Sequence, residues 1–284
     1  MFKEDTLQDK TILITGGGSG LGLAMAQKFA SLGANIAICG RTKEKLEQAV
    51  QKIRTHEKSK VDFYVCDVRN YEVVEEMIQA IVRDFGAMEG LVNNAAGNFL
   101  STSEDLTPNG FNTVIDIVLN GTFNCTHTFG NYLIKRERPG NILNMVTTYT
   151  ETGSAFVLPS ACAKAGVLAL TNTLAYEWAE YNIRLNSIAP GPFPTKGAWT
   201  RLMPDKSFED QYLSKIPAGR YGDREELANL AAFLMSDMAP YITGESVIID
   251  GGEHLKSGQF NFINEMLPRD ELKKLFVKMK SGRK

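Results

Sequence analysis

Cysteine is scarce and scattered in this sequence. Four of the 284 residues are cysteine, namely Cys39, Cys66, Cys125 and Cys162, and no two of them form a CxxC pair. A disulfide framework or a zinc site would need thiols that are closer or more regularly spaced. Each cysteine lies among apolar or small residues. We therefore expect four reduced, buried thiols in a reducing compartment, and no metal site.

The sequence also lacks an excess of charge, a targeting segment and a long apolar run. Its 31 Lys and Arg against 33 Asp and Glu give a formal net charge of -2, which argues against a nucleic-acid partner. The first ten residues, MFKEDTLQDK, are polar and acidic where a signal peptide needs an apolar run. No segment approaches the roughly 20 apolar residues of a membrane span. The expectation is a cytoplasmic protein without a membrane span.

Short β-branched runs alternate with helix-like runs along the chain. Strands are expected at TILIT, NIAIC, VDFYVCDV, LVNNA, NILNMVT, RLNSIAP and SVIIDGG. Strands separated by helices imply parallel pairing with right-handed crossovers. The predicted fold is a single α/β domain of the Rossmann type over residues 1–284, with about seven strands in a doubly wound parallel sheet and helices on both faces.

Two segments break this alternation. Residues 194–222 combine prolines, aromatics and charges, which suits a substrate lobe on a core of about 8–252. The tail, residues 253–284, ends in PRDELKKLFVKMK, which predicts an amphipathic helix. We expect this helix to pack on the body or on a partner subunit, with a lid over the ligand as the alternative.

A glycine-rich segment follows the first strand. TGGGSGLG, Thr15 to Gly22, lies between that strand and a helix-like run. Glycine lets the backbone turn tightly and approach a pyrophosphate, whose charge then meets free amides at a helix N-terminus. A dinucleotide site is expected. Its contacts in this loop are Gly16, Gly17, Gly18, Ser19, Gly20 and Leu21.

The end of the second strand indicates which dinucleotide binds. NAD enzymes usually place a carboxylate here, which accepts from the ribose 2′-hydroxyl. This chain instead has Cys39, Gly40, Arg41 and Thr42. Arg41 offers a fork of donors to a 2′-phosphate. The sequence therefore favours NADPH as the cofactor.

Over nearly the whole chain, as far as Gly252, the sequence resembles the short-chain dehydrogenases/reductases. The resemblance rests on TGGGSGLG, CDV at 66–68, NNAAG at 93–97, a lysine-bearing helix and PGPFPT at 190–195. It implies that Asp67 contacts the adenine end of the cofactor and that Asn93 stabilises the fourth strand. It also implies a loop over the nicotinamide, made by Pro190, Gly191, Pro192, Phe193 and Thr195.

Three of the four groups that reduce a carbonyl in most members of that family are altered here. Those members use a tyrosine four residues before the lysine, a serine thirteen residues before the tyrosine, and an asparagine in the preceding long helix. The matching positions hold Ser160, Thr147 and Val118, and Lys164 alone remains. The nearest tyrosine before the lysine is Tyr149, fifteen residues away. Ordinary ketone or alcohol chemistry is therefore disfavoured.

This altered set resembles one subgroup, the 2,4-dienoyl-CoA reductases of the mitochondrial type. The long matches are NNAAGNF at 93–99, DIVLNGTF at 116–123, TETGSAFVLPSACAKAGV at 150–167, PGPFPTKGA at 190–198, ELANLAAFL at 226–234 and GGEHLKSGQFN at 251–261. The resemblance implies NADPH-dependent reduction of 2,4-dienoyl-CoA thioesters to trans-3-enoyl-CoA in the β-oxidation of unsaturated fatty acids. A homotetramer is implied in the same way.

The subgroup also implies a division of roles. Tyr149 is the acid, with Asn98 opposite. Hydride arriving at C5 pushes electrons to the thioester oxygen, where this pair forms an oxyanion hole. Lys164 holds the nicotinamide ribose, and Ser160 joins the hydrogen-bond network. The contacts to the CoA substrate map to Arg69, Phe99, Thr107, Tyr149 and Arg201.

Other functions stay open at this point. A trans-2-enoyl-CoA reductase of the same subgroup would also bind CoA thioesters. A non-catalytic NADPH-binding regulator is a second alternative, although it would not need Lys164, Tyr149 and Asn98 together. Carbonyl reduction is a weaker third. Acyl chain length and the donor of the final proton are not set by the sequence.

Overall fold

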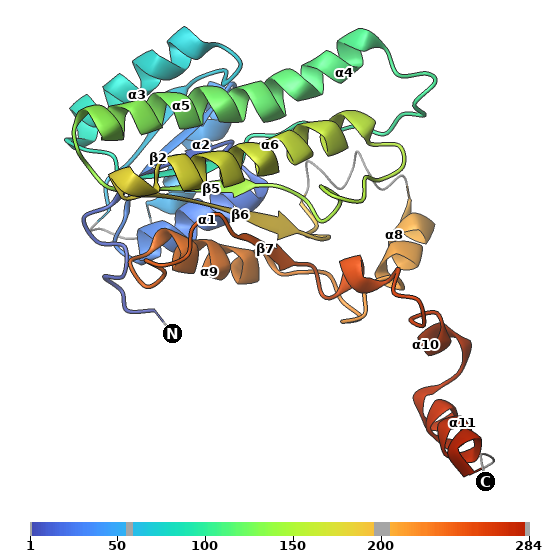
Figure 1. Ribbon diagram of the computed structural model, residues 1–284. Helices are drawn as coiled ribbons and strands as arrows, with labels where there is room; N and C mark the ends of the chain where they lie inside the picture. The colour runs from blue at the N-terminus through green and yellow to red at the C-terminus, as the bar shows by residue number, and fades with distance from the viewer. Residues whose placement is uncertain (1, 55–58, 196–204, 282–284) are drawn as a thin grey trace.

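The chain is built on one parallel β-sheet. The structure is a computed structural model that describes residues 2–54, 59–195 and 205–281. Its sheet has seven strands in the order β3-β2-β1-β4-β5-β6-β7 (Figure 1). The strands are β1 (Thr11–Thr15), β2 (Asn35–Gly40), β3 (Val61–Val65), β4 (Gly90–Asn93), β5 (Gly140–Met145), β6 (Ile183–Pro190) and β7 (Ser246–Ile249). Every neighbouring pair is parallel, which confirms the predicted doubly wound sheet.

Helices cover both faces of the sheet (Figure 1). On one face lie α1 (Gly20–Ser31), α2 (Lys43–Ile53) and α9 (Arg224–Met235), and on the other α3 (Tyr71–Phe85), α5 (Gly121–Lys135) and α6 (Leu158–Glu177). Phe29 and Leu46 are buried in the first core, and Ile78 and Phe129 in the second. Each such side chain contributes about 1.5–3 kcal/mol by burial. The two cores therefore hold the strand ends, and the loops that follow them, in fixed positions.

The helix before α5 is interrupted. α4 (Pro108–Ile115) continues into a π-helical turn, η1 (Asp116–Asn120), before α5 begins. π-turns of this kind are frequent at functional sites. Val118, which the resemblance matches to the family's asparagine, lies in this turn and is fully buried. It packs with Val146 and Ala163 in a small third core beside β5 and α6.

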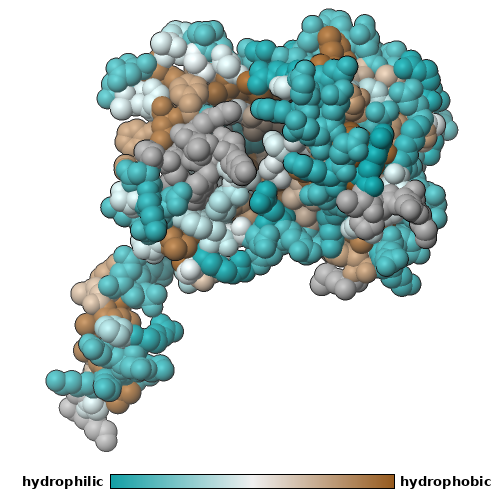
Figure 2. Space-filling view, turned by 180° about the vertical axis from the view of Figure 1, so that it is seen from behind, coloured by the Kyte–Doolittle hydropathy of each residue, from teal (hydrophilic) through white to brown (hydrophobic). Residues whose placement is uncertain are grey.

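The lobe and the tail contain short helices. The described part of the lobe forms α8 (Lys206–Leu213), whose first amides bond the capping side chain of Asp205. After β7 come η3 (Glu253–Leu255), α10 (Ile263–Met266) and α11 (Arg269–Ser281), which is the helix expected in the tail. The tail extends away from the sheet (Figure 1). Figure 2 shows apolar side chains between polar ones along it, and Phe260, Phe262 and Phe276 are among those exposed.

Three of the four cysteines are buried thiols, as expected, but Cys162 is exposed. The expectation was wrong for Cys162 because successive helix residues are turned by about 100°. Ser160, Ala163 and Lys164 face inward from α6, whereas Cys162 faces outward. Among the described helices, none is long and apolar enough to cross a membrane.

Candidate active site

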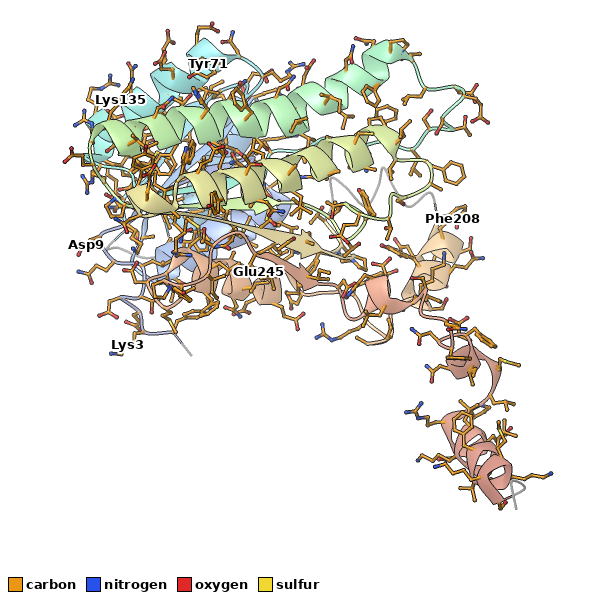
Figure 3. The ribbon with its side chains drawn as sticks, in the orientation of Figure 1. Lys3, Asp9, Tyr71, Lys135, Phe208 and Glu245 are labelled. Carbon is orange, nitrogen blue, oxygen red and sulfur yellow. The ribbon has the colours of Figure 1, made fainter. Side chains whose placement is uncertain are left out.

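The carboxyl ends of the strands define the candidate site. The strand order reverses between β1 and β4, because β2 and β3 lie on one side of β1 and the later strands lie on the other. Ligands of doubly wound sheets bind in the crevice at such a switch point. The glycine-rich loop follows β1, and NNAAG follows β4. Figure 3 places Phe208, on α8, at this side of the molecule and Lys135 at the opposite side.

The glycine-rich loop has the geometry of an anion site. Gly16 and Gly20 have φ angles of 66° and 57°, which glycine adopts without steric cost. A Cβ atom on Gly17 would lie 2.5 Å from Cγ2 of Ile38, so a side chain has no room there. Ser19 starts α1 without a side-chain cap, and the first turn holds no acidic residue. The first amides of α1 are thus left to an outside acceptor.

The loop after β6 contacts the glycine-rich loop. A Cβ atom on Gly20 would lie 3.4 Å from Cγ2 of Thr195. Phe193 is buried, and a Cβ atom on Gly222 would lie 2.3 Å from its ring, so the loop is packed tightly from behind. Two segments far apart in sequence, both expected to bind the cofactor, therefore lie side by side.

Charged groups gather at the ends of β2 and β3. Arg41 is exposed, and no described residue forms an ion pair or a hydrogen bond with it. Arg69 donates to the carboxylate of Asp67 through Nε at 3.0 Å and Nη2 at 2.6 Å. The hydrogen bonds from Arg69, with a smaller contribution from Arg41, hold the pKa of Asp67 below its ordinary value. Arg41 is thus available to an anion, while Arg69 is engaged.

Tyr149 and Ser160 meet across the gap in sequence. The hydroxyl Oη of Tyr149 lies 3.1 Å from Oγ of Ser160. Tyr149 comes from the loop after β5, whereas Ser160 and Lys164 lie one turn apart on α6. Lys164 is buried, and its ammonium group donates to the backbone carbonyl of Met145. Burial lowers the pKa of Lys164 from 10.5 to about 8.

Asn98 lies on the loop after β4, which is tied to the loop of Tyr149. Its Oδ1 accepts from the amide of Phe99 at 2.9 Å, and no described residue accepts from its side-chain N–H groups. The amide of Ser101 donates to the carbonyl of Phe156 at 3.0 Å and joins the two loops. Phe156 has a φ of 66°, a strained conformation for a bulky residue. Such strain persists where the surrounding structure enforces it, as at an active site.

The residues expected to contact CoA are divided in the structure. A Cβ atom on Gly110 would lie 3.2 Å from both Cζ of Phe99 and Oγ1 of Thr107, so Phe99 and Thr107 meet at the start of α4. Thr107 also caps α4 by accepting from the Gly110 amide at 3.1 Å. Arg69 lies between β3 and α3 and bonds Asp67, and no described hydrogen bond joins it to Phe99 or Thr107. Arg201 lies outside the described residues.

A buried polar chain supports this edge of the sheet. Nδ2 of Asn93 donates to Oδ1 of Asn144 at 2.8 Å, and Nδ2 of Asn144 donates to Oγ1 of Thr171 at 2.8 Å. All three residues are buried. Buried polar groups are stable only when paired. This series of buried hydrogen bonds therefore fixes β4 against β5 and α6, directly beneath the loops that carry Asn98 and Tyr149.

Two residues at this edge were missed by the sequence analysis. Tyr212, on α8, forms a hydrogen bond with Glu253, the first residue of η3. Oε2 of Glu253 is buried without a partner among the described residues. It lies 3.2 Å from the position of a Cβ atom on Gly191. No local motif marks these residues, because they meet only in the folded chain.

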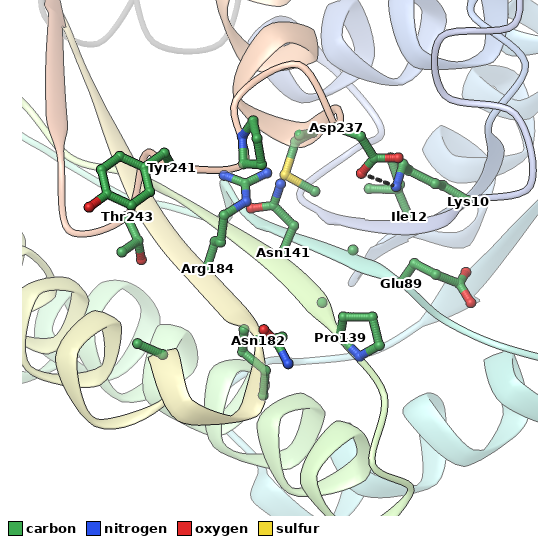
Figure 4. Close-up of a pocket in the computed structure, with 16 residues that line it drawn as sticks. Lys10, Ile12, Glu89, Pro139, Asn141, Asn182, Arg184, Asp237, Tyr241 and Thr243 are labelled. Carbon is green, nitrogen blue, oxygen red and sulfur yellow. Dashed lines mark hydrogen bonds and ion pairs between the residues drawn. The ribbon is translucent and has the colours of Figure 1, made fainter.

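A separate cavity of about 710 Å³ lies at the opposite edge, by the amino ends of the strands (Figure 4). Its charged side chains are already paired with other side chains or bonded to the backbone. Lys10 pairs with Asp237 at 2.8 Å, and Arg184 donates to the carbonyls of Ile242 and Leu234 at 3.0 Å. None of the expected site residues lines this cavity. Its charged side chains therefore serve the fold.

Comparison with known proteins decides the family. The family model described as enoyl-(acyl carrier protein) reductase matches residues 16–254. The chain belongs to the short-chain dehydrogenase/reductase family. It is therefore an oxidoreductase with a Rossmann-type domain for NAD or NADP, as its solved relatives also indicate.

The relatives of this reductase include several named for one activity. The "Probable 2,4-dienoyl-CoA reductase [(2E)-enoyl-CoA-producing]" of Bacillus subtilis is 45% identical over 89% of this chain and 100% of its own. The "Peroxisomal 2,4-dienoyl-CoA reductase [(3E)-enoyl-CoA-producing]" of Arabidopsis thaliana is 37% identical over 96% of this chain and 92% of its own. The two names agree on the substrate class and differ in the position of the remaining double bond.

Solved structures support the fold. The crystal structure of a short chain dehydrogenase from Bacillus anthracis is 46% identical, with a TM-score of 0.80 over 87% of this chain and 98% of that chain. A gluconate 5-dehydrogenase from Burkholderia cenocepacia, in complex with NADP and tartrate, is 32% identical, with a TM-score of 0.82 over 88% of this chain and 97% of that chain. The latter shows that a relative binds NADP.

Proposed function

We propose that this reductase uses NADPH to reduce 2,4-dienoyl-CoA thioesters to trans-3-enoyl-CoA, in the β-oxidation of unsaturated fatty acids. The observation that carries the proposal is the pairing of Tyr149 with Ser160, 3.1 Å apart, next to the buried Lys164. A serine occupies the usual place of the acid, and a tyrosine reaches it from the strand end. The relatives named for dienoyl-CoA reduction support this substrate class.

The residues present fit a dinucleotide with a 2′-phosphate. The uncapped amides of α1 suit a pyrophosphate, and Arg41, which has no described partner, suits a 2′-phosphate. Lys164 would hold the nicotinamide ribose, and Thr195 would contact the carboxamide. Bound NADPH would supply the hydride that C5 of the substrate receives.

The protein's own contribution is to stabilise the charge that develops on the thioester oxygen. The phenol of Tyr149 and the side-chain amide of Asn98 donate to this oxygen, whose charge grows as the dienolate forms. One such donor is worth roughly 10²- to 10³-fold in rate. Ser160 orients the Tyr149 hydroxyl, and the positive charge of Lys164 attracts the negative charge that develops in the site.

The CoA thioester would lie over the start of α4. Phe99 and Thr107 meet there, and the aromatic ring offers an apolar surface beside the acyl chain. Arg69 would have to share its guanidinium between Asp67 and a CoA phosphate. Arg201 stays a proposed contact from the resemblance alone.

One second candidate has a specific observation behind it. The matching family model carries the description of an enoyl reductase, so a trans-2-enoyl thioester is the alternative substrate. The same donors would stabilise the shorter enolate. The two functions separate by which thioester is consumed.

The test is a panel of dienoyl-, enoyl- and ketoacyl-CoA esters, each with NADPH and with NADH. We expect dienoyl-CoA with NADPH to react fastest. Tyr149→Phe should lower kcat at least about 10²-fold. Tyr176→Phe alters a tyrosine on α6 that is 89% exposed, so it should leave kcat unchanged. Near wild-type turnover in Tyr149→Phe would refute the role of this acid. Wild-type protein that binds NADPH without turning over any ester would indicate a regulator.

The assembly is proposed to be a homotetramer, as the resemblance implies. The apolar side chains exposed on the tail support association, because a large apolar surface in water favours contact with another chain. Light scattering of the full chain should give four times the mass of 31.4 kDa.

A further inference from the structure

The proton that completes the reduction has no donor among the residues assigned so far. Addition of hydride at C5 leaves a dienolate, and the product needs one proton on carbon. Tyr149 and Asn98 both donate to the thioester oxygen in the proposed site. We propose that Tyr212, resupplied by Glu253, delivers this proton to the α carbon of the substrate. This inference rests on the proposed function.

Glu253 is placed as a proton reservoir next to the cofactor loop. Its Oε2 is buried and has no partner in the described part of the chain. The same atom lies 3.2 Å from the Cβ position of Gly191, in the loop expected over the nicotinamide. An ionised carboxylate oxygen left unpaired in such a place costs several kcal/mol. A protonated carboxyl group resolves this cost.

Tyr212 connects this carboxyl group to the reacting end of the site. Its hydroxyl bonds Glu253, and it lies close enough to Tyr149 for their charges to interact. α8, which carries Tyr212, is fixed by the hydroxyl of Tyr221, which donates to the carbonyl of Glu209 at 2.7 Å. The order along this edge is therefore Glu253, Tyr212, Tyr149 and Ser160.

The charged surroundings of Glu253 agree with this placement. Burial is the largest effect and raises its pKa above the ordinary 4.5, and Asp250 after β7 raises it further. Tyr212 on α8, Lys215 after α8 and His254 on η3 act in the opposite direction. The net effect is that Glu253 keeps its proton to higher pH than an exposed glutamate does.

The proton transfer balances in atoms and electrons. The C–H bond at the α carbon forms from the electron pair of the dienolate as the O–H bond of Tyr212 breaks. The Tyr212 phenolate then takes the proton of Glu253, and solvent returns one proton to Glu253. Each turnover consumes one hydride from NADPH and one proton from solvent, and no other reductant takes part.

The position of this donor sets the product. A dienolate accepts a proton at the α carbon, which gives a 3-enoyl thioester, or at C4, which gives a 2-enoyl thioester. The α carbon is one bond from the thioester carbonyl, whereas C4 is three bonds away. A donor on the Tyr149 side of the site is therefore placed for the α carbon rather than for C4. The relatives are named for one product or the other, so protein groups must make this choice.

The test compares Glu253→Gln and Tyr212→Phe with Tyr176→Phe, the same kind of change at a tyrosine that is 89% exposed on α6. In deuterated water, the wild-type product should carry one deuterium at the α carbon. Both variants should lose about 100-fold in kcat, and a larger share of their product should be the 2-enoyl ester with deuterium at C4. NADPH affinity and melting temperature should stay near wild type. Tyr176→Phe should behave like wild type in all these measurements.

The pH profile separates proton supply from structural support. In the wild type, kcat should fall as pH rises through the ionisation of Glu253, and this limb should be absent in Glu253→Gln. If both variants keep the wild-type rate, product and profile while dienoyl-CoA is still reduced, the inference is overturned and the proposed function stands. Loss of NADPH affinity in Glu253→Gln would also overturn it, because Glu253 would then only support the Gly191 loop. A wild-type protein inactive on dienoyl-CoA removes both proposals.

Discussion

Replacing Lys164 with methionine should make the cofactor-free protein more stable at neutral pH. Lys164 is buried, and burial lowers its pKa from 10.5 to about 8. This difference corresponds to about 3 kcal/mol by which the charged ammonium destabilises the folded chain at pH 7. Methionine has a similar length without the charge. It also removes the donor to the Met145 carbonyl, at a cost of about 1 kcal/mol, so the expected net gain is about 2 kcal/mol.

The dependence of this gain on pH follows from the sign of the pKa change. The pKa of Lys164 is lower in the folded chain than in the unfolded chain, so the unfolded chain binds more protons between about pH 8 and 10.5. Above pH 10.5, Lys164 is neutral in both states and does not lower the free energy of unfolding of the wild type. This stability is lost as pH falls through 8, where the buried amine becomes charged in the folded chain as well.

Urea denaturation of both proteins, at equal concentration between pH 7 and 10.5, measures the gap in free energy of unfolding. The gap should close or reverse by pH 10.5. A constant gap, or a wild type more stable than Lys164→Met at pH 7, would refute the reasoning.

Three more predictions concern the cofactor loop and the polar chain. Gly17→Ala should lower the free energy of unfolding by about 1–3 kcal/mol in thermal denaturation, because the added Cβ would lie 2.5 Å from Ile38. Gly18→Ala is the control and should change stability little, because its Cβ would lie no closer than 3.4 Å to any neighbouring atom. Arg41→Ala should weaken NADPH binding about 10- to 100-fold in fluorescence titrations and leave NADH binding unchanged, so equal losses would contradict the role of Arg41. Thr171→Val should cost about 1–3 kcal/mol in urea denaturation, since it leaves Nδ2 of Asn144 unpaired. The exposed Thr173→Val is its control, and equal costs would argue against the polar chain.

The strands were the most predictable part of the molecule. TILIT became β1 over Thr11–Thr15, and the parallel pairing followed from the helices between strands. β-branched runs bounded by glycine are local signals, so they can be recognised without the fold. The reversal of strand order between β1 and β4 is not local, because it depends on how distant helices pack on the two faces.

The parts of the site that could be predicted are those in which a short sequence motif determines the local backbone conformation. The left-handed glycines of the first loop are of this kind. The contact of Tyr149 with Ser160 depends on the path of a loop that includes a strained Phe156, and residue spacing does not encode such a path. The bond from Arg69 to Asp67, two residues before it, was not predicted, and the contact of Arg69 with CoA stays a proposal. The meeting of Tyr212 with Glu253 has no local signal at all.

Tyr149 and Lys164 belong to elements of unequal stability. Residues 151–156, which follow Tyr149, are exposed, and a Cβ atom on Gly153 would meet no heavy atom within 4 Å. Lys164, by contrast, sits on the buried side of a 20-residue helix. Local unfolding of the exposed loop would therefore withdraw the acid and leave the cofactor lysine in place. The enzyme could then hold its cofactor while it lacks a donor to the thioester oxygen, and hydrogen exchange at the Ser101 amide, which bonds Phe156, would measure how often the loop opens.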